Sequence, residues 1–489
     1  PGLERYWVPS DAESALFGTK FADSWFDVHT GGDLAFLNGV GKYLLELGAV
    51  DETFVSNRTA GFAAWKASLD AQPYDLLERL SGTTREEMRR FAELLAGAKN
   101  AVFVWSMGLT QHRHGSDTVR ALANLGLARG YVGREKCGLM PIRGHSGVQG
   151  GAEVGCAPNV LPGGGLDEVN RRRIESIWGF PVPTAKGLHA VEALEAAHRG
   201  EIDVLWSIGG NFLETLPDPL AVKETLARVP FRVHQDIVLT SQMLVPPLDE
   251  VLLLPATTRY EMPGGGTETS TERRIYFSPE IPGRRIGEAR PEWEVLVEVA
   301  SRAFPGRATA ILNDASKDTP GVRREIARTQ PLYAGIETLA KKGDAVQWGG
   351  PLLGVERFAT PDGKARFQPV DPPERNLPEG AFFVSTRRGK QFNSMVHKDR
   401  DPLNGARRDD VLVSKDDAAR LGLANGDPVR LRRNGVHYDG RARIAVIKPG
   451  NLQVHWPEGN VLVQKDDCDV ESGVPDYNAV VRLEKRSEP

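Results

Sequence analysis

The chain has 489 residues, which is too many for one hydrophobic core, so we expect it to divide into several domains. Its 40% hydrophobic and 26% charged residues are ordinary for a globular protein. A net charge of −4 and a pI near 6.3 argue against a broad basic surface for nucleic acid. No apolar run approaches the roughly 18–20 residues that a membrane span needs.

The three cysteines indicate the cellular compartment, and the first residues indicate whether the chain is a fragment. Cys137, Cys156 and Cys468 are far apart, so they form neither a disulfide framework nor a metal cluster within this chain. That usage is typical of a reducing compartment, and we expect a cytoplasmic protein. The chain starts at Pro1 without a Met or a signal-peptide pattern, so we expect a fragment whose front is absent, and any export signal would lie there.

The first third of the chain alternates between predicted strands and helices. Residues 21–28 are typical of a strand, and apolar spacing predicts an amphipathic helix over residues 34–47. Thr84, with a glutamate three residues later, predicts a helix start, and that helix runs to about residue 97. It leads into an apolar strand at residues 102–105. This alternation predicts a parallel sheet.

The same alternation returns after residue 150. Buried-type strands are predicted at residues 203–208, 231–236 and 251–255, each ending in small or polar residues. Ligands bind at such ends in open α/β sheets. A glycine-rich loop at residues 264–267 is equally consistent with a close approach to a ligand and with a surface turn.

The last third has a different pattern. Residues 301–375 are weakly patterned and contain scattered prolines, which indicates linker and wrapping segments. From residue 381 onward, short alternating stretches are interrupted by one predicted helix at residues 416–422. These stretches predict a small β-barrel domain.

The segment from residue 102 to residue 155 is the most informative about chemistry. Its strand ends in a Gly-containing loop at residues 106–112, an arrangement that presents backbone N–H groups to phosphate. A second Gly-rich loop follows at residues 137–151, where Arg143 is a suitable anchor for a small anion. The pair predicts an enzyme with a large phosphate-bearing cofactor.

Several collinear motifs resemble one family. In the predicted barrel, the sequence TRRGKQFNSMVH at residues 386–397 is similar to the opening of the C-terminal molybdopterin-dinucleotide-binding domain. The similarity continues at residues 417–429, 448–451, 455–461 and 475–478. Upstream, residues 106–111, 143–150, 235–241, 254–256 and 261–274 also resemble family segments in the same order. The chain therefore resembles the molybdopterin oxidoreductases related to DMSO reductase, and among them the formate dehydrogenase alpha-subunit-like branch.

The resemblance implies a fold and a division into domains. The fold class is α/β, with two Rossmann-like parallel-sheet domains, the first incomplete, followed by a C-terminal β-barrel of the double-psi type. Residues 1–145 would be the last part of the first dinucleotide-binding domain and residues 146–300 part of the second. Residues 301–375 would be linker, and residues 376–489 would form the cofactor-binding barrel.

The resemblance also implies a bis-molybdopterin guanine dinucleotide cofactor carrying molybdenum or tungsten. A carboxylate can accept hydrogen bonds from the N–H edge of guanine, and Asp33 and Asp236 are suited to this contact. The alternative role for Asp33 is a helix N-cap. The alternative interpretation of Gly108, Gly209 and Gly210 is that they only form turns, and the alternative for His455 is a purely structural role. The implied cofactor-binding residues are Asp33, Met107, Gly108, Gln111, Gly209, Gly210, Asn211, Gln235, Asp236, Arg387, Gln391, Asn393, Ser394, His397, His455, Glu458 and Asn460.

Arg143 and His145 are the predicted catalytic residues. In the implied mechanism the Arg143 guanidinium orients a small oxyanion and stabilises its charge, whereas the alternative is an internal salt bridge. His145 is a candidate proton carrier near neutral pH. The sequence reads His145-Ser146-Gly147 where formate dehydrogenases read Gln-Asn-Asn, so the substrate stays open at this point.

Three functions remain as hypotheses. The first is formate dehydrogenase-like oxidation of a small-molecule oxyanion, with electrons passing to a [4Fe-4S] cluster in the absent front part and on to an electron-transfer partner subunit. The second keeps the cofactor but reduces nitrate or an S- or N-oxide. The third is a non-catalytic scaffold subunit that retains the fold. For the fragment alone we expect no turnover.

Overall fold

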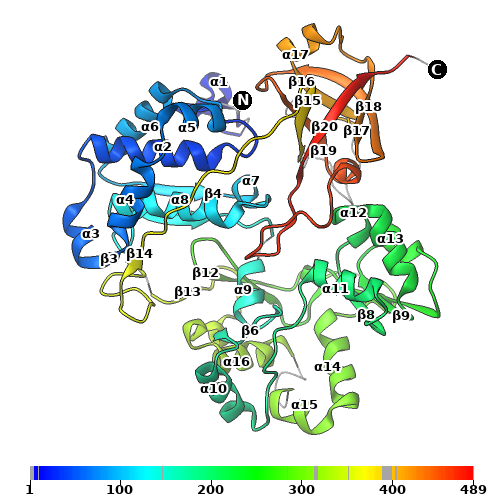
Figure 1. Cartoon of the computed structure of the whole chain (residues 1–489). Helices are drawn as coiled ribbons and strands as arrows, with labels where there is room; N and C mark the ends of the chain where they lie inside the picture. Colours follow the sequence, from blue (N-terminus) through cyan, green and yellow to red (C-terminus); the bar gives the residue numbers. More distant parts are fainter. Residues whose placement is uncertain are drawn as a thin grey trace. The chain divides into compact units, whose positions relative to one another are not determined.

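The computed structural model describes residues 5–8, 10–145, 147–283, 285–312, 318–350, 352–387, 399–401 and 405–487. The chain divides into two compact units (Figure 1). Unit 1 comprises Pro1–Phe103, Leu109–Leu139 and Arg357–Pro489, and unit 2 comprises Val104–Gly108 and Met140–Glu356. The first and last thirds of the sequence therefore fold together in unit 1.

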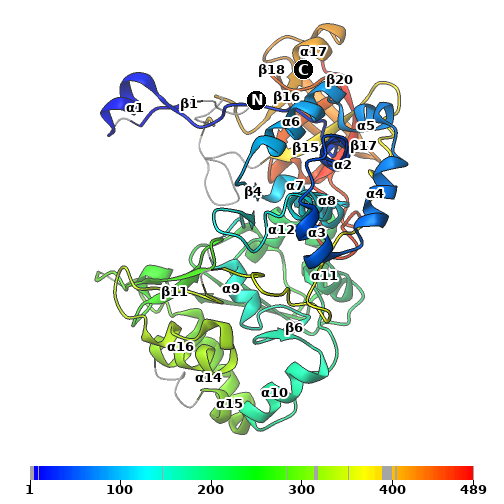
Figure 2. The ribbon, with the colours of Figure 1, turned by 90° about the vertical axis from the view of Figure 1, so that its left-hand side faces the viewer.

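The helical part of unit 1 is built around α2 (Asp33–Glu46). Its other elements are β1 (Arg5–Tyr6), α1 (Ala12–Phe17), β2 (Thr19–Lys20), α3 (Glu52–Arg58), β3 (Thr59–Ala60), α4 (Phe62–Asp70), α5 (Tyr74–Ser81), α6 (Arg85–Gly97) and α8 (Gly115–Ala128). Helices α4, α5, α6 and α8 surround α2 (Figures 1 and 2). Because of these neighbours α2 is buried around most of its circumference, including Asn38, so the expectation of an amphipathic helix is wrong.

Two further predictions for the first third had opposite outcomes. Helix α6 starts as expected, since the Thr84 side chain accepts a hydrogen bond from the amide of Glu87 at 3.2 Å. Residues 21–28, however, form no strand. A strand needs a neighbour to complete its hydrogen bonds, and no strand of the described chain pairs with these residues. Phe21 and Trp25 are accordingly exposed.

Strand β4 (Val102–Trp105) leads into helix α7 (Met107–Thr110) and forms a two-stranded sheet with β5 (Gly138–Pro141). The amide of Gly138 donates to the carbonyl of Ala101, and that of Ile142 donates to Trp105. Both partners advance in the same direction, so the pair is parallel. The expected parallel sheet of the first α/β region is thus confirmed, with two strands.

The C-terminal part of unit 1 is a closed six-stranded barrel with the strand order β15-β19-β16-β18-β17-β20. Its parallel pairs are β15 with β19 and β16 with β18, and Val384, Val413, Val429 and Leu452 are fully buried inside it. The predicted C-terminal β-barrel is confirmed. Its elements are β15 (Ala381–Arg387), β16 (Asp410–Ser414), α17 (Lys415–Arg420), β17 (Pro428–Arg433), β18 (Val436–Ala445), β19 (Asn451–His455), η5 (Glu458–Leu462) and β20 (Asn478–Lys485).

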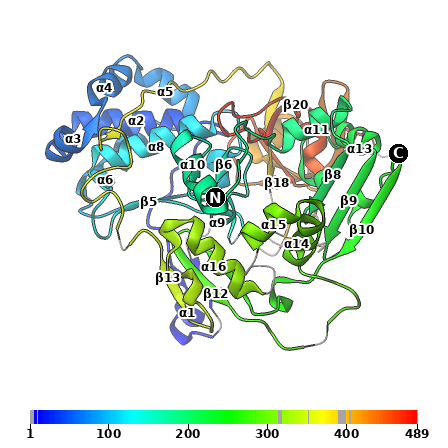
Figure 3. The same cartoon turned by 90° about the horizontal axis from the view of Figure 1, so that it is seen from below.

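The main sheet of unit 2 has the order β10-β9-β8, and both of its strand pairs are parallel. The three strands are β8 (Val204–Ile208), β9 (Phe231–Asp236) and β10 (Glu250–Pro255), which lie side by side in Figure 3. The second predicted parallel sheet is therefore confirmed. Its surrounding elements are α11 (Ala190–His198), α12 (Phe212–Thr215), α13 (Pro219–Arg228), η1 (Ser241–Leu244) and α14 (Glu292–Ala303).

A second sheet of unit 2 is antiparallel and consists of β11 (Gly266–Thr269), β12 (Arg274–Ser278) and β13 (Ala345–Gln347). Its buried core includes Tyr333, Ile336 and Trp348. The remaining elements of unit 2 are α9 (Val148–Glu153), β6 (Val160–Leu161), β7 (Gly164–Gly165), α10 (Glu168–Trp178), η2 (Arg259–Glu261), α15 (Pro305–Leu312), α16 (Thr319–Thr329), η3 (Pro331–Tyr333) and η4 (Ile336–Thr338).

The expected linker at residues 301–375 is instead largely folded. Residues 318–350 form helices, a strand and core positions of unit 2. Their buried apolar side chains are spaced irregularly among the prolines, so no regular pattern in the sequence predicted these elements. Strand β14 (Ala365–Arg366) and its flanks wrap unit 1, where the Asn124 amide donates to the carbonyl of Gln368 at 2.8 Å. Among the described helices, none combines the length and apolarity required for a membrane crossing.

Candidate active-site cavity and cofactor-contact residues

Arg143 and His145 line one cavity of about 280 Å³ in unit 2, so the structure brings the two predicted catalytic residues together. The loop that carries them follows β5 directly. The remaining lining residues, none of which was proposed as a site residue from sequence, are Gly144, Gln149, Glu268, Thr269, Ser270, Thr271 and Tyr276. Five of these belong to the β11–β12 hairpin, which lies more than a hundred residues later in the chain.

Two hydrogen bonds hold the two walls of this cavity together. The amide of Gly147 donates to the carbonyl of Thr269 at 3.2 Å, and the amide of Gly150 donates to the Thr269 hydroxyl at 3.0 Å. A Cβ atom at Gly150 would lie only 2.7 Å from Cγ2 of Thr269, so glycine is needed for this close approach. The family segment at residues 261–274 is the signal that pointed to the second wall.

The charge in the cavity is uncompensated at Arg143. Its Nη1 donates to the backbone carbonyl of Pro141 at 3.2 Å, and no carboxylate among the described residues forms an ion pair with it. Glu268 also lines the cavity, but its carboxylate is paired with Arg259 at 2.8 Å. The alternative of an internal salt bridge for Arg143 is therefore not observed. An exposed guanidinium among hydroxyl and amide groups suits a small anion.

Gln149 is positioned by a partly buried hydrogen-bond network. Its side-chain amide donates to Oε1 of Glu153 at 2.7 Å, and the Tyr333 hydroxyl donates to Oε2 of the same carboxylate. Burial, and then the neighbouring Glu153 carboxylate, raises the pKa of Tyr333 above its usual range, so this hydroxyl stays a donor. The Gln149 side chain is thus presented to the cavity in one orientation.

The predicted loop after β4 is one turn of helix, α7, in the structure. The Ser106 hydroxyl donates to the carbonyl of Ile142 at 2.9 Å, which ties this segment to the Arg143 loop. A Cβ atom at Gly144 would lie 3.3 Å from the sulfur of Met107. Gly108 has no left-handed φ and open space around its Cβ position, so its backbone conformation does not itself require glycine.

The carboxyl ends of β8 and β9 bring Gly209, Gly210, Gln235 and Asp236 together in unit 2. Gly209 and Gly210 have φ values of 66° and 76°, and nothing lies within 4 Å of a Cβ atom built on either one. Gln235 is fully buried, yet neither atom of its amide group has a hydrogen-bond partner in the described structure. A left-handed glycine pair with free space and an unsatisfied buried amide fit a phosphate-bearing ligand.

Two neighbouring residues hold this edge of the sheet. Asn211 is buried and its amide donates to the Ser241 hydroxyl at 3.0 Å, so it has a structural role here. Gln242, which was not anticipated from sequence, accepts from the amide of Phe212 at 2.7 Å and donates to the carbonyl of Gly210 at 3.0 Å. Asp236 accepts from the amide of Ile237 at 2.7 Å.

In unit 1, the loop before α2 packs on the barrel. The amide of Thr30 donates to Oδ1 of Asn451 at 3.2 Å, and the Asn451 amide lies 3.0 Å from Nδ1 of His29. Burial, then Arg375 and Lys448, lowers the pKa of His29 to about 4. The segments around Asp33 and around residue 451, both predicted from family motifs, are therefore neighbours.

Asp33 is the first residue of α2, whose N-cap is Gly32, so the alternative role of Asp33 as N-cap is wrong. Burial raises the pKa of the Asp33 carboxyl to about 6, against a smaller opposing effect of its own backbone amide. Among the described residues no other side chain pairs with this carboxyl group, which suits an N–H donor from a ligand.

The pKa of Asp33 leads to a prediction for the cofactor-free protein. A carboxyl whose pKa rises from 3.8 to about 6 on folding contributes stability below pH 3.8 that is lost as the pH rises through 6. We therefore expect Asp33→Asn to raise the melting temperature at pH 7 and to have no effect near pH 4. Melting curves from pH 4 to pH 7 measure this. Glu52→Gln, at the exposed first turn of α3, is the control, and equal pH profiles for parent and Asp33→Asn would contradict the prediction.

Gln111 also contacts a barrel motif within unit 1. Its backbone carbonyl accepts from the amide of Tyr477 at 3.2 Å, and the amide of Arg113 donates to Asp476 at 3.3 Å. Nearby, Ser116 donates twice to the carboxylate of Asp469. Although burial raises the pKa of Asp469, hydrogen bonds from Ser116 and Ser472 outweigh it and hold the pKa at about 2. Two pairs of family motifs thus meet in unit 1.

Arg387, His455, Glu458 and Asn460 gather at one end of the barrel. Nη2 of Arg387, the last residue of β15, lies 3.6 Å from buried Asp401, and Glu458 pairs with Arg408 at 2.5 Å. His455 is fully buried, and burial, then the charge of Arg387, lowers its pKa to about 4, so its ring is neutral at pH 7. Asn460 is buried in η5. Gln391, Asn393, Ser394 and His397 lie outside the described residues.

Comparison with known proteins gives the family. Residues 9–302, more than half of the chain, match the family model described as molybdopterin oxidoreductase. The chain belongs to the molybdopterin oxidoreductase family. Residues 382–481, which form the barrel, match the molybdopterin dinucleotide-binding domain. Both matches confirm the resemblance drawn from the motifs. The described residues contain no group of His, Cys, Asp or Glu that could hold a metal ion.

Three known proteins are similar to this chain in sequence or in fold. Probable oxidoreductase YjgC of Bacillus subtilis is 30% identical over 84% of this chain and 42% of its own length. F420-dependent formate dehydrogenase subunit alpha of Methanocaldococcus jannaschii is 27% identical over 90% of this chain and 66% of its own length. Acetylene hydratase from Pelobacter acetylenicus shares the fold, with a TM-score of 0.70 at 17% identity over 95% of this chain and 72% of that chain. The chain therefore spans only part of its curated relatives.

Proposed function

We propose that the protein containing this chain is a formate dehydrogenase-like oxidoreductase that binds a bis-molybdopterin guanine dinucleotide with molybdenum or tungsten. The observation that carries the proposal is the cavity of Arg143, a cation without a carboxylate partner in the described structure, faced by Gln149 and the β11–β12 hairpin. Relatives named as formate dehydrogenases support it.

The described residues fit a dinucleotide. Gly209 and Gly210 offer backbone and open space for phosphate, and Gln235 offers an unsatisfied amide. The carboxyl groups of Asp33 and Asp236 suit the N–H edge of guanine, and Arg387 suits a phosphate, while Met107, Gly108, Gln111, Asn211, His455, Glu458 and Asn460 stay predicted contacts. When bound, the cofactor supplies the two-electron redox chemistry.

Arg143 would bind the carboxylate or other oxyanion of the substrate through charge-assisted hydrogen bonds. Gln149, held by Glu153, would contribute an amide of defined orientation beside it. His145 lies in the same cavity and would carry a proton to or from solvent. Because Arg143 is cationic, it favours formate or nitrate over neutral S- and N-oxides, and nitrate reduction is therefore the second candidate.

Metal and nucleotide analysis of the full-length protein tests this proposal. We expect about one molybdenum or tungsten atom and two guanine nucleotides per chain after purification from a host that makes the cofactor. Protein from a host unable to make molybdopterin is the control and should contain neither. A folded full-length protein without metal and guanine from the competent host would refute the proposal and favour a non-catalytic scaffold.

A further inference from the structure

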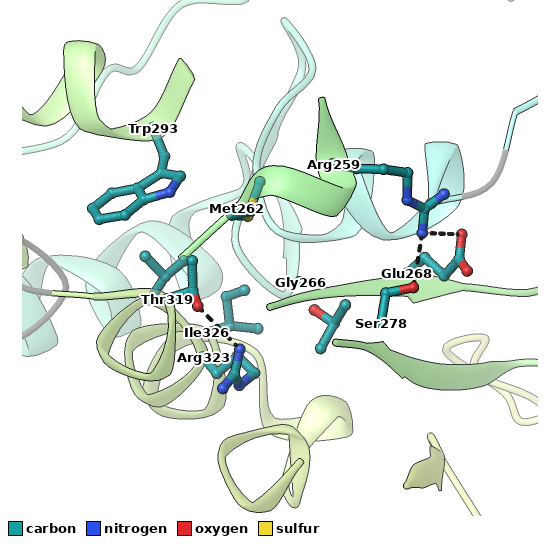
Figure 4. A pocket seen from close by; sticks show the side chains of 12 residues that line it. Arg259, Met262, Gly266, Glu268, Ser278, Trp293, Thr319, Arg323 and Ile326 are labelled. Atoms are coloured by element: carbon teal, nitrogen blue, oxygen red, sulfur yellow. Dashed lines mark hydrogen bonds and ion pairs between the residues drawn. The ribbon is translucent and has the colours of Figure 1, made fainter. Parts of the chain in front are cut away.

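Unit 2 contains a second cavity, of about 450 Å³, that shares Glu268 with the cavity of Arg143 (Figure 4). Its volume lies in the range of small-molecule sites. One wall comes from α16 and another from the β11–β12 hairpin and η2. The lining is mixed, with apolar side chains from Met262, Trp293, Val322 and Ile326 and polar ones from Arg259, Glu268, Ser278, Thr319 and Arg323.

Arg323 is a buried cation without an anionic partner. The residue is 4% exposed, and the hydrogen bond from its Nη1 to the Thr319 hydroxyl is long at 3.5 Å. Nε is buried and has no partner, and no carboxylate of the described chain forms an ion pair with the group. The guanidinium lies 5.1 Å from the centre of the Phe277 ring, which compensates the charge only in part. Buried charges are otherwise almost always paired.

The other charges of the cavity are already neutralised. Arg259 pairs with Glu268 at 2.8 Å and donates to the Ser278 hydroxyl, as the dashed lines of Figure 4 show. Within the described lining, Arg323 therefore supplies the uncompensated charge. Burial lowers the pKa of its guanidinium, while the Asp318 carboxylate opposes this effect. An anion placed in the cavity would remove that electrostatic penalty.

Trp293 adds a directional donor. Its indole N–H is buried and has no hydrogen-bond partner in the described structure, so it also needs an acceptor. Met262 and Ile326 supply apolar surface between this donor and Arg323 (Figure 4). A ligand that satisfies all three features has an anionic head and an apolar body.

We propose that this cavity binds a small organic carboxylate with an apolar body. Its carboxylate pairs with the Arg323 guanidinium, its body packs on Met262 and Ile326, and the indole N–H of Trp293 donates to a second acceptor or to the same head. The site is separate from the polar cavity of Arg143, so the proposal stands without the proposed redox function.

Isothermal titration calorimetry of the full-length protein with phenylacetate tests the proposal, with phenylacetamide as the neutral analogue of equal shape. We expect one phenylacetate site with a Kd below about 1 mM, and at least about tenfold weaker binding of the amide, since a tenfold change is the loss of one charge-assisted contact. This comparison uses the parent protein alone. Equal affinities, or no saturation at about 10 mM phenylacetate, would overturn the proposal.

Variants locate the site. Arg323→Met should weaken phenylacetate binding at least about tenfold and Arg323→Lys less, while Arg324→Met, on the same helix but ion-paired with Asp318, should leave it unchanged. If Arg323→Met fails to fold, Trp293→Phe serves instead, and the quenching of tryptophan fluorescence that phenylacetate causes in the parent should be lost in this variant. Binding that is lost in Arg143→Met but retained in Arg323→Met would assign the ligand to the other cavity and refute the proposal.

Discussion

Replacing Arg143 by methionine is expected to lower kcat/KM for formate by about 10²–10³-fold in the cofactor-loaded full-length enzyme. The guanidinium has no carboxylate partner in the described structure, so its charge is available to an oxyanion. Methionine keeps an unbranched apolar stem and removes the charged guanidinium. Steady-state assays on formate and on nitrate measure the loss, and the anion that turns over in the parent identifies the reaction.

Three controls separate this effect from misfolding. Arg143→Lys keeps the charge but loses the bidentate geometry and should retain intermediate activity. Arg302→Met removes an exposed cation of the same unit, paired with Glu298, and should behave as the parent. Metal content should be equal in all variants. An Arg143→Met enzyme with full activity and a full metal complement would exclude Arg143 from substrate binding.

Truncating Trp65 to alanine is expected to lower the free energy of unfolding of unit 1 by about 3–5 kcal/mol. Trp65 on α4 is 2% exposed and stacks on Phe367, with ring centres 5.0 Å apart. It also lies against α2, since a Cβ atom at Gly41 would be 3.1 Å from its ring. The change therefore leaves a cavity where α2, α4 and the segment after β14 meet.

Urea dependence of hydrogen exchange at the amides of α2 and α4 measures this loss locally, without assuming that both units unfold together. Trp65→Phe should lose less, because it keeps one stacked ring. Leu94→Ala, at an exposed position of α6, should change the stability by less than about 0.5 kcal/mol. A loss for Trp65→Ala no larger than that of Leu94→Ala would show that this junction contributes little.

Local patterns predicted many elements well where a segment satisfies its own requirements. Barrel strands β17 and β20 alternate between buried and less buried residues, and α6 carries its own cap at Thr84. Predictions failed where the neighbours decide. Residues 21–28 have a strand-like composition but no pairing partner, and α2 looks amphipathic but is surrounded by four helices. In residues 318–350 the core positions follow no regular period, so the sequence pattern did not predict them.

The same division holds for the site. Arg143, His145 and the glycines after β8 were predicted because they belong to short motifs with their own chemistry. Gln242 and the hairpin residues Thr269 and Tyr276 were not predicted as site residues, since their roles come from contacts with segments far away in sequence. The cavity of Arg323 has no motif at all and arises only from packing.

By itself the sequence determined the family, the α/β and barrel classes and the loops that carry candidate cofactor and substrate contacts, because these depend on local periodicity and contiguous motifs. Only the tertiary structure decided which segments face one another: the β11–β12 hairpin opposite Arg143, residue 451 beside the loop before Asp33, and Arg323 buried without a counter-charge. The physical reason is that burial, pairing and charge compensation are set by neighbours in space, which the order of residues does not specify.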